Sequence, residues 1–224
     1  MERRQAAADQ TRSRILQAAR KLLLADDFRE FTVDAVAKAA DVSRLTVYYQ
    51  FGSKAGLLEA LYDTIARSGH LQRIRDVFRY GNVALQKIHQ FMEIFVQFWD
   101  SERVVIRRLH ALGVIDPEVG RGLRERNERR RKALSVLVDQ YSVSYLFIKI
   151  REQLVLDKLH MLTSFETFDA LAINGRSADE VYQVLKMMAD ETLLISPRPL
   201  FKADPVKIEL KRRRSRSSRR RSQS

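Results

Sequence analysis

The chain has 224 residues, 45% of them hydrophobic, so it is long enough to bury the core of one large or two small domains. The absence of cysteine excludes disulfides and thiol chemistry, and the absence of long apolar runs argues against a signal peptide or a membrane partner. The net charge is +13, but residues 197–224 hold 11 basic against 2 acidic residues, so most of this charge belongs to the C-terminal end.

The first residues, 1–9, are polar and carry Arg3 and Arg4 beside a short alanine run. We expect this segment to be disordered, either as a solvated tail or as a basic arm that lies in a minor groove. Hydrophobic periodicity then predicts a helix over 10–25. Its inward stripe consists of Ile15, Ala18, Ala19 and Leu22.

Residues 32–51 predict two short helices joined by a tight turn. Thr32 and Ser43 are good N-cap residues, so we expect a helix to begin after each of them. Val42 plugs the turn between the two helices. The buried face of the first helix recurs at i, i+3, i+4 and i+7 and consists of Val33, Val36, Ala37 and Ala40. This pattern predicts a helix-turn-helix unit, whose second helix lies in the DNA major groove.

A longer ordered motif runs from Thr32 to Leu58, with the form Thr-x-x-x-Val-Ala-x-x-Ala-x-Val-Ser-x-x-Thr-Val-Tyr-x-x-Phe-x-Ser-Lys-x-x-Leu-Leu. This string resembles the TetR family of transcriptional regulators. The turn holds Asp41 where the family usually has glycine, and aspartate tolerates the left-handed conformation better than most residues. The resemblance implies a helical N-terminal domain that binds operator DNA, and a helical C-terminal domain that dimerises and binds a small molecule.

Two helix starts in this region carry a cation directly after the N-cap, namely Arg44 after Ser43 and Lys54 after Ser53. A cation there opposes the positive end of the helix dipole, unless a phosphate lies between the cation and the exposed N–H groups. We therefore predict that both residues contact DNA, with solvated side chains as the alternative. The predicted DNA-binding residues are Thr32, Ser43, Arg44, Leu45, Thr46, Tyr48, Tyr49, Gln50 and Lys54. Among them, Arg44, Thr46 and Tyr48 or Tyr49 are assigned to bases and nearby phosphates.

A further helix is expected from Ser53, with Leu57, Leu58, Leu61 and Ile65 facing inward. A stretch rich in arginine follows at 68–82, where we place the boundary between two domains. The predicted organisation is a helix-turn-helix domain at 8–68, an effector-binding and dimerisation domain at 69–196, and a basic tail at 197–224.

The helix predicted over 83–100 carries more aromatic side chains than a small bundle needs. Met92, Phe95 and Trp99 fall at spacings of three and four, so they share one helix face. Aromatic residues with methionine suit an adaptable pocket, and we predict a small apolar or aromatic effector. The predicted effector-binding residues are Met92, Phe95, Trp99, His110 and Thr163. The alternative is that these rings fill a solid core.

The middle of the chain predicts a short helix over 104–112 and a long one over 117–140. The run Arg121–Lys132 in the long helix is heavily charged, so we expect a solvated face, with a second DNA surface as the alternative. Residues 141–150 have a composition that fits a strand, but between two helices we expect a loop.

A final pair of helices is predicted, one ending near Ile173 and one beginning at the capping box Ser177–Glu180. Both have surplus apolar surface, which an intermolecular four-helix bundle would cover. The pair is similar in arrangement to the dimerising helices of TetR-like regulators. The predicted dimer interface consists of Phe165, Phe168, Val181, Val184 and Met188.

No enzyme chemistry is visible in the sequence. There is no G-x-G-x-x-G, no phosphate-binding loop and no G-x-S-x-G, and the four histidines lack ligand spacing. We therefore expect no catalytic residues, no metal site and no cofactor. Glycine and proline are scarce, with 8 and 4 residues, which favours an all-α fold.

The sequence as a whole predicts a homodimeric, ligand-responsive repressor in the cytoplasm, associated with the nucleoid through double-stranded operator DNA. The operator should be pseudo-palindromic, with half-sites about one helical turn apart. A rival function comes from Lys211–Ser224, a low-complexity Arg/Ser segment that we expect to be disordered and to bind polyanions. In that case the protein would bind nucleic acid, RNA included, without sequence preference.

Overall fold

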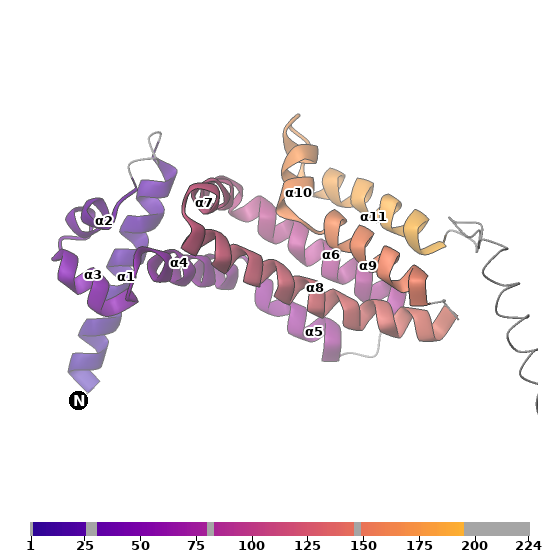
Figure 1. Cartoon of the computed structure of the whole chain (residues 1–224), viewed down its shortest axis with the longest axis horizontal. Helices are drawn as coiled ribbons and strands as arrows, with labels where there is room; N and C mark the ends of the chain where they lie inside the picture. The colour runs from indigo at the N-terminus through magenta and orange to yellow at the C-terminus, as the bar shows by residue number, and fades with distance from the viewer. Residues whose placement is uncertain (1, 26–30, 80–82, 146–148, 195–224) are drawn as a thin grey trace, which may run out of the picture. The chain divides into compact units, whose positions relative to one another are not determined.

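The computed structural model describes residues 2–25, 31–79, 83–145 and 149–194, and residues 1–192 form one compact unit. Within these ranges every regular element is a helix, which confirms the predicted all-α fold (Figure 1). None of the helices in this part of the chain is long and apolar enough to cross a membrane. The predicted Arg/Ser-rich tail lies outside the described residues.

The first four helices are α1 (Glu2–Leu24), α2 (Val33–Ala39), α3 (Arg44–Phe51) and α4 (Lys54–Ser68). α2 packs against α1 and α3, and α4 packs against the same two helices, so the four elements share one core. The largest side chains that are fully buried among these four helices are Ile15, Leu23, Leu57, Leu61 and Ile65.

α1 begins at Glu2, so the prediction of a disordered segment before residue 10 is wrong. Ala6, Ala7 and Ala8 lie among Glu, Arg and Gln residues, which all have high helix propensity, and no glycine or proline interrupts them. Leu23 is fully buried, whereas Leu22 is only half-buried. The inward face therefore continues from Ile15 at spacings of four residues and not through Leu22.

The turn between α2 and α3 has the conformation that the motif predicts. Asp41 has a φ of 52°, so this aspartate takes the left-handed conformation. The turn is closed by a hydrogen bond from Val42 N to Ala37 O at 3.0 Å. α3 ends at Gly52, whose φ is 75° and whose N–H donates to Tyr48 O, an ending that favours glycine. The predicted helix-turn-helix unit is confirmed.

Within the described ranges, eight further helical elements follow α4. They are η2 (Leu71–Arg73), α5 (Ile74–Arg79), α6 (Ala84–Ser101), α7 (Arg103–Ile115), α8 (Pro117–Tyr145), α9 (Lys149–Leu162), α10 (Phe165–Ala172) and α11 (Ala178–Leu194). α8 is central, because it packs against α4, α6, α7 and α9 (Figure 1). Fully burying one large apolar side chain stabilises a fold by about 1.5–3 kcal/mol. The largest of those buried among these helices are Phe91, Phe98, Ile106, Leu109 and Phe168.

Helices also occur in two segments where none was predicted. Residues 71–79, in the stretch where the domain boundary was placed, form η2 and α5. The predicted loop at 141–150 is wrong for residues 141–145, which extend α8, and for residues 149 and 150, which begin α9. Residues 146–148 lie outside the described ranges.

The corner between α7 and α8 is built on two glycines. α7 continues through Gly113 to Ile115, past the break that was expected at the glycine. A Cβ atom added to Gly120 would lie 2.4 Å from the carbonyl oxygen of Gly113, and a Cβ atom on Gly113 would lie 2.7 Å from Leu123. The two helices can approach this closely because neither glycine has a side chain.

The single helix that was predicted to end near Ile173 is two helices, α9 and α10. Ser164 caps α10, since its hydroxyl accepts a hydrogen bond from Thr167 N at 3.2 Å. The Thr163 hydroxyl donates to Leu159 O at 2.9 Å and finishes α9. The capping box before α11 is confirmed, because Glu180 N donates to Ser177 Oγ and Ser177 N donates to a Glu180 carboxylate oxygen.

Candidate functional site

The outward face of α3 is apolar and aromatic. Val47 is buried beneath the helix, whereas the side chains of Leu45 and Tyr49 are 78% and 87% exposed. Tyr48 lies beside them and is also exposed. Large apolar side chains on one exposed helix face commonly mark a binding surface. The structure therefore brings the predicted recognition residues together on a single accessible face.

Arg44, at the first position of α3, is held by two neighbours. Its Nη1 donates to Asp34 Oδ2 at 2.9 Å, and its Nη2 donates to the Tyr48 hydroxyl at 3.2 Å. The Tyr48 hydrogen bond and then the charge of Asp34 raise the pKa of Arg44 above its ordinary value. Both members of the ion pair are exposed, and such pairs contribute little to stability. Arg44 can therefore exchange Asp34 for DNA at small cost.

The predicted caps hold the other candidate residues in place. Ala35 N donates to Thr32 Oγ1 at 3.1 Å, Thr46 N donates to Ser43 Oγ at 3.1 Å, and Gly56 N donates to Ser53 Oγ at 3.0 Å. These bonds confirm that all three residues are N-caps. The Ser43 and Thr46 hydroxyls also hydrogen-bond to each other at 2.8 Å.

Arg12 of α1, which the sequence did not single out, anchors the end of α3. Its Nη1 donates to Gln50 O at 2.7 Å, and its guanidinium carbon lies 4.3 Å from the centroid of the Phe51 ring. The spacing of polar residues on α1 gave no sign of this contact, because the partner is a backbone carbonyl far along the chain. Arg12 thus fixes the position of α3 on the core.

Lys54, the other predicted phosphate contact, lies where α4 meets the start of α8. Its Nζ atom is 3.7 Å from Asp116 Oδ2, and both side chains are partly exposed. The second oxygen, Asp116 Oδ1, accepts hydrogen bonds from Glu118 N and Val119 N and so caps α8. One carboxylate therefore joins the predicted DNA contact to the long central helix.

A second link between α4 and α8 is made by Arg126. Its Nη2 donates to Glu59 O at 3.2 Å and lies 2.7 Å from Asp63 Oδ1. Its guanidinium carbon is 4.3 Å from the centroid of the Tyr62 ring. Burial raises the pKa of Tyr62 to about 12, so this phenol is neutral at physiological pH.

Two of the predicted effector residues, Trp99 and His110, contact the ring of Phe165. The centroid of Trp99 lies 5.7 Å from that of Phe165, and the centroid of His110 lies 5.0 Å from it. The indole N–H of Trp99 donates to Thr163 O at 3.0 Å. Met92 and Phe95 are buried on the same helix as Trp99. We refer to the residues Met92, Phe95, Trp99, His110, Thr163 and Phe165 as the aromatic compartment.

His110 at the edge of this compartment is paired with Glu166. His110 Nδ1 lies 2.9 Å from Glu166 Oε1. This hydrogen bond is the main reason that the pKa of Glu166 falls to about 2. The carboxylate of Glu166 therefore stays ionised throughout the physiological range.

Arg130 on α8 is a functional candidate that sequence reasoning missed. Its residue is only 6% exposed, so the prediction of a solvated face for the run Arg121–Lys132 is wrong at this position. Its Nη2 lies 3.1 Å from His160 Nε2, and its guanidinium carbon is 5.7 Å from the centroid of Phe95. Burial lowers the pKa of Arg130 to about 10, at which the group is still charged near neutral pH. The sequence could have indicated its burial, because Arg130 shares a helix face with Leu123, seven residues before it, and Leu134, four residues after it.

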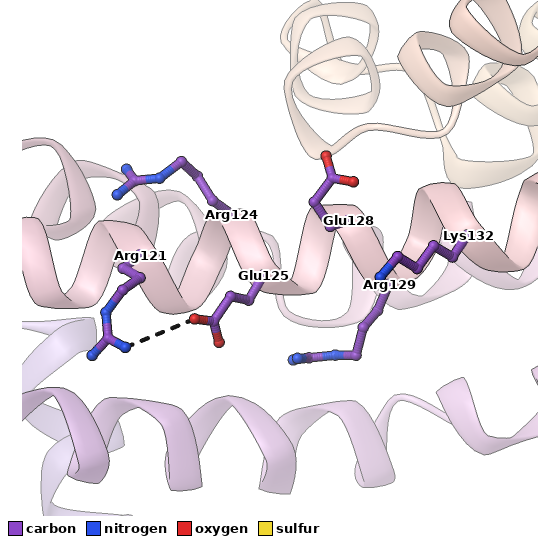
Figure 2. Close-up of a pocket in the computed structure, with 6 residues that line it drawn as sticks. All are labelled: Arg121, Arg124, Glu125, Glu128, Arg129 and Lys132. Atoms are coloured by element: carbon purple, nitrogen blue, oxygen red, sulfur yellow. Dashed lines mark ion pairs between the residues drawn. The ribbon is translucent and has the colours of Figure 1, made fainter. Parts of the chain in front are cut away.

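Other members of the charged run do form an exposed face, although Arg126 and Arg131 are partly buried in ion pairs. This face surrounds a shallow hollow of about 350 Å³ whose lining residues all come from α8 (Figure 2). They are Arg121, Arg124, Glu125, Glu128, Arg129 and Lys132. Figure 2 shows these side chains spreading outward from one helix, with Arg121 paired to Glu125 at 3.8 Å. Four of these six side chains are basic and two are acidic, so the face carries charges of both signs with a small excess of positive charge.

The predicted dimer residues divide into two groups. Phe165, Phe168 and Val181 are buried within the single chain. Val184 is half-buried and Met188 is exposed, so these two reach the surface. Three apolar side chains that were not predicted are also exposed on the last helices or at their ends, namely Met161, Ile173 and Met187.

Known proteins resemble both the sequence and the fold. Residues 15–61 match the model of the family described as bacterial regulatory proteins, tetR family. The HTH-type transcriptional regulator AlkX of Mycobacterium tuberculosis is 34% identical over 84 residues. That alignment covers 36% of this chain and 40% of the relative, so the chain spans well under half of the relative's length.

Solved structures are similar over most of the chain. A transcriptional regulator of the TetR/AcrR family from Thermobifida fusca has a TM-score of 0.58 and 21% identity, covering 84% of this chain and 98% of that one. GusR from Salmonella enterica has a TM-score of 0.61 and 22% identity, with coverage of 82% and 95%. At these identities the likeness shows the fold alone. Sequence motif, family model and fold agree: residues 15–61 match the tetR family of bacterial regulatory proteins, and the fold of the chain is similar to that of TetR-family transcriptional regulators.

Proposed function

We propose that the protein is a homodimeric repressor that binds a pseudo-palindromic operator and responds to a small molecule. The observation that carries the DNA-binding part is the face of α3. Leu45 and Tyr49 are highly exposed there, and Arg44 precedes them at the helix start beside the exposed Tyr48. A short helix that is held on three neighbours and presents such a face fits a major groove.

In the proposed domain organisation, residues 8–68 bind DNA, residues 69–196 bind the effector and dimerise, and residues 197–224 form a basic tail. Dimerisation is supported by the exposed apolar side chains of Met187 and Met188 on α11 and of Met161 on α9, with the half-buried Val184 beside them on α11. A symmetric dimer would place two α3 helices in successive major grooves, about 34–36 Å apart. Bound to operators, the protein would reside in the cytoplasm at the nucleoid.

The proposed response to an effector runs through the two links between α4 and α8. Lys54 contacts Asp116, and Arg126 contacts Asp63 and Glu59. An effector that binds one position of α8 better than another would shift the population of positions that the DNA-binding domain adopts. The two α3 helices of a dimer would then no longer match both half-sites.

Selection from a random pool of duplex DNA tests this function directly. The full-length chain is expected to enrich a two-fold symmetric sequence, and so is a chain without residues 206–224. If binding came from the basic tail, the truncated chain would lose nearly all affinity and the full chain would enrich no sequence. That result would favour the rival function over a repressor.

A further inference from the structure

Arg130 is a charged residue in the interior of the helical bundle, with neighbours from four helices. It lies on α8 and faces Phe95 of α6 and His160 of α9. The charge of Glu166 on α10 acts on it, and the neutral phenol of Tyr62 on α4 lies near it. Arginine only donates hydrogen bonds, so His160 must accept through Nε2 and carry its own proton on Nδ1. The pKa of His160 is lowered, first by burial and then by the charge of Arg130, which keeps this imidazole neutral.

Most of the hydrogen-bonding capacity of this guanidinium is unused within the described part of the chain. Nε and Nη1 of Arg130 are buried and have no hydrogen-bond partner there. Glu166 is the carboxylate that acts on Arg130, but it accepts a hydrogen bond from His110 and its side chain is largely exposed. A buried cation without a paired anion is costly, and natural folds rarely keep one without a use for it.

We infer that Arg130 is the recognition group for the effector, and that the effector is an organic monocarboxylate with an apolar body. The inference rests on the proposed ligand response and gives that ligand a chemical class. The guanidinium would bind the carboxylate through the N–H groups that are now unpaired. The aromatic compartment next to it would cover the apolar body.

The surroundings of Arg130 select this class over other anions. A carboxylate matches the planar fork of donors on a guanidinium. Arg130 packs against Phe95, which belongs to the aromatic compartment; the Phe95 and Trp99 rings are tilted to each other, with centroids 5.5 Å apart. Apolar neighbours of this kind favour an aliphatic or aromatic body over water. With His160 neutral, one positive charge faces the ligand, so a single negative charge balances it and a dianionic phosphate does not.

The position of Arg130 also connects the ligand to the DNA-binding helices. Arg126 lies four residues earlier on α8, which is one helical turn, and it makes the contacts to Asp63 and the Glu59 carbonyl of α4. A carboxylate that draws Arg130 toward it would shift the segment of α8 that carries Arg126. The link to α4 then responds to the charge of the ligand.

The test measures binding to the full-length chain with two matched pairs of probes. Octanoate is compared with octanamide, and 3-phenylpropanoate with 3-phenylpropanamide, while acetate supplies the charge without a body. Fluorescence of Trp99, the chain's single tryptophan, and calorimetry report binding. We expect each carboxylate to bind about ten- to a hundredfold more tightly than its amide, and acetate to bind far more weakly than either carboxylate. Equal affinity for acid and amide, or no binding of either carboxylate, overturns the inference.

Variants at Arg130 distinguish recognition from a structural role. Arg130→Met is expected to lose the preference for acid over amide, while the melting temperature of the ligand-free protein stays equal or rises, because an unpaired buried charge has been removed. Arg129→Met, one residue away on the exposed face of α8, is the matched control and should change neither property. A lower melting temperature with unchanged carboxylate affinity in Arg130→Met would make Arg130 a structural residue.

Two further outcomes keep the inference separate from the proposed function. If Arg130→Met does not fold, Arg130→Lys decides, since it keeps the charge and loses the planar fork; it should bind octanoate several-fold more weakly, and wild-type affinity overturns the inference. Specific DNA binding without carboxylate binding would overturn the ligand class and leave the regulator intact. Carboxylate binding without specific DNA binding would support the ligand class and contradict the proposed operator function.

Discussion

Single residues show where pattern reasoning succeeds and where it does not. Thr32, Ser43 and Ser53 were predicted as N-caps from their type and place, and all three accept the expected hydrogen bonds, because capping is a local interaction. Arg130 was predicted to be solvent-exposed like its charged neighbours, because the prediction followed its residue type and not its position on the helix face. The partners of Arg12 and Lys54 are far away in sequence, so no local sequence pattern could predict these contacts.

The first prediction contrasts Arg44→Ala with Lys54→Ala on the selected operator. Arg44→Ala should relax the preference at one operator position, at a cost of about 1–3 kcal/mol there, because a base contact is lost. Lys54→Ala should weaken binding to operator and random duplex alike and reduce the salt slope by about one, because a phosphate contact is lost. Fluorescence anisotropy at several salt concentrations measures both. An equal loss on specific and random DNA for Arg44→Ala would argue against base reading.

The second prediction concerns His160 and pH. The pKa of this imidazole is lowered in the folded state, by burial first and by Arg130 second, so the fold prefers its neutral form. The unfolded chain, with an ordinary histidine pKa of about 6.5, binds more protons, and stability must therefore fall as pH drops below that value. The stabilisation is complete above about pH 6.5 and is lost as pH falls through the lowered pKa. Urea midpoints between pH 8 and pH 5 should show this decline.

His160→Gln is the control for that measurement, because glutamine keeps an acceptor for Arg130 and has no proton to gain. The variant should show a shallower decline of the urea midpoint over the same interval. An identical decline in wild type and variant would assign the pH dependence to other groups.

Whole helices were predicted well where an apolar stripe repeats at helical spacing. α2, α3, α4, α6 and α11 all begin within about two residues of their predicted starts, which is the usual uncertainty of a boundary. The errors lie at α1, which extends to Glu2, at the end of α8, and at the break between α9 and α10. Those boundaries depend on weak helix propensities and on a single capping serine, and the spacing of apolar residues carries no information about either.

The third prediction tests the link between α4 and α8. Asp116→Asn keeps an oxygen to cap α8 but removes the charge that faces Lys54. Lys54 would then be free for phosphate, and affinity for any duplex should rise a few-fold, since an exposed ion pair is worth about 0.2–1 kcal/mol. Anisotropy on random duplex measures the gain. The double variant Asp116→Asn with Lys54→Ala should show none, and a gain that persists there would place the effect elsewhere.

At the scale of the whole molecule, the sequence predicted the all-α fold and the motif for DNA binding, but the surface that would join two copies depends on tertiary packing. Phe165, Phe168 and Val181 seemed available on helical wheels, and the folded chain buries all three. The large apolar side chains of α11 that are exposed lie further along the helix, at Met187 and Met188. Which face of an apolar helix is inward can be decided only after its partners are placed.

The fourth prediction is that Met187→Asp combined with Met188→Asp converts a dimer to monomers without unfolding. Met187 and Met188 are 61% and 41% exposed in the single chain, so charges there cost little in a monomer but oppose a shared apolar interface. Light scattering should show half the mass and circular dichroism an unchanged helix content. Gln183→Asp, also exposed on α11, is the control and should leave the mass unchanged. A double variant that keeps the wild-type mass would move the interface away from α11.

The glycine contact between α7 and α8 has a mechanical consequence. Gly113 and Gly120 meet with no side chain between them, and Leu123 fills the space beside Gly113. Close-packed contacts of this kind transmit displacement and do not absorb it. The corner is therefore rigid and does not act as a hinge, so α7 and the first turns of α8 must move together. A rotation of this part of α8 would therefore also move Asp116, the residue that joins the two helices.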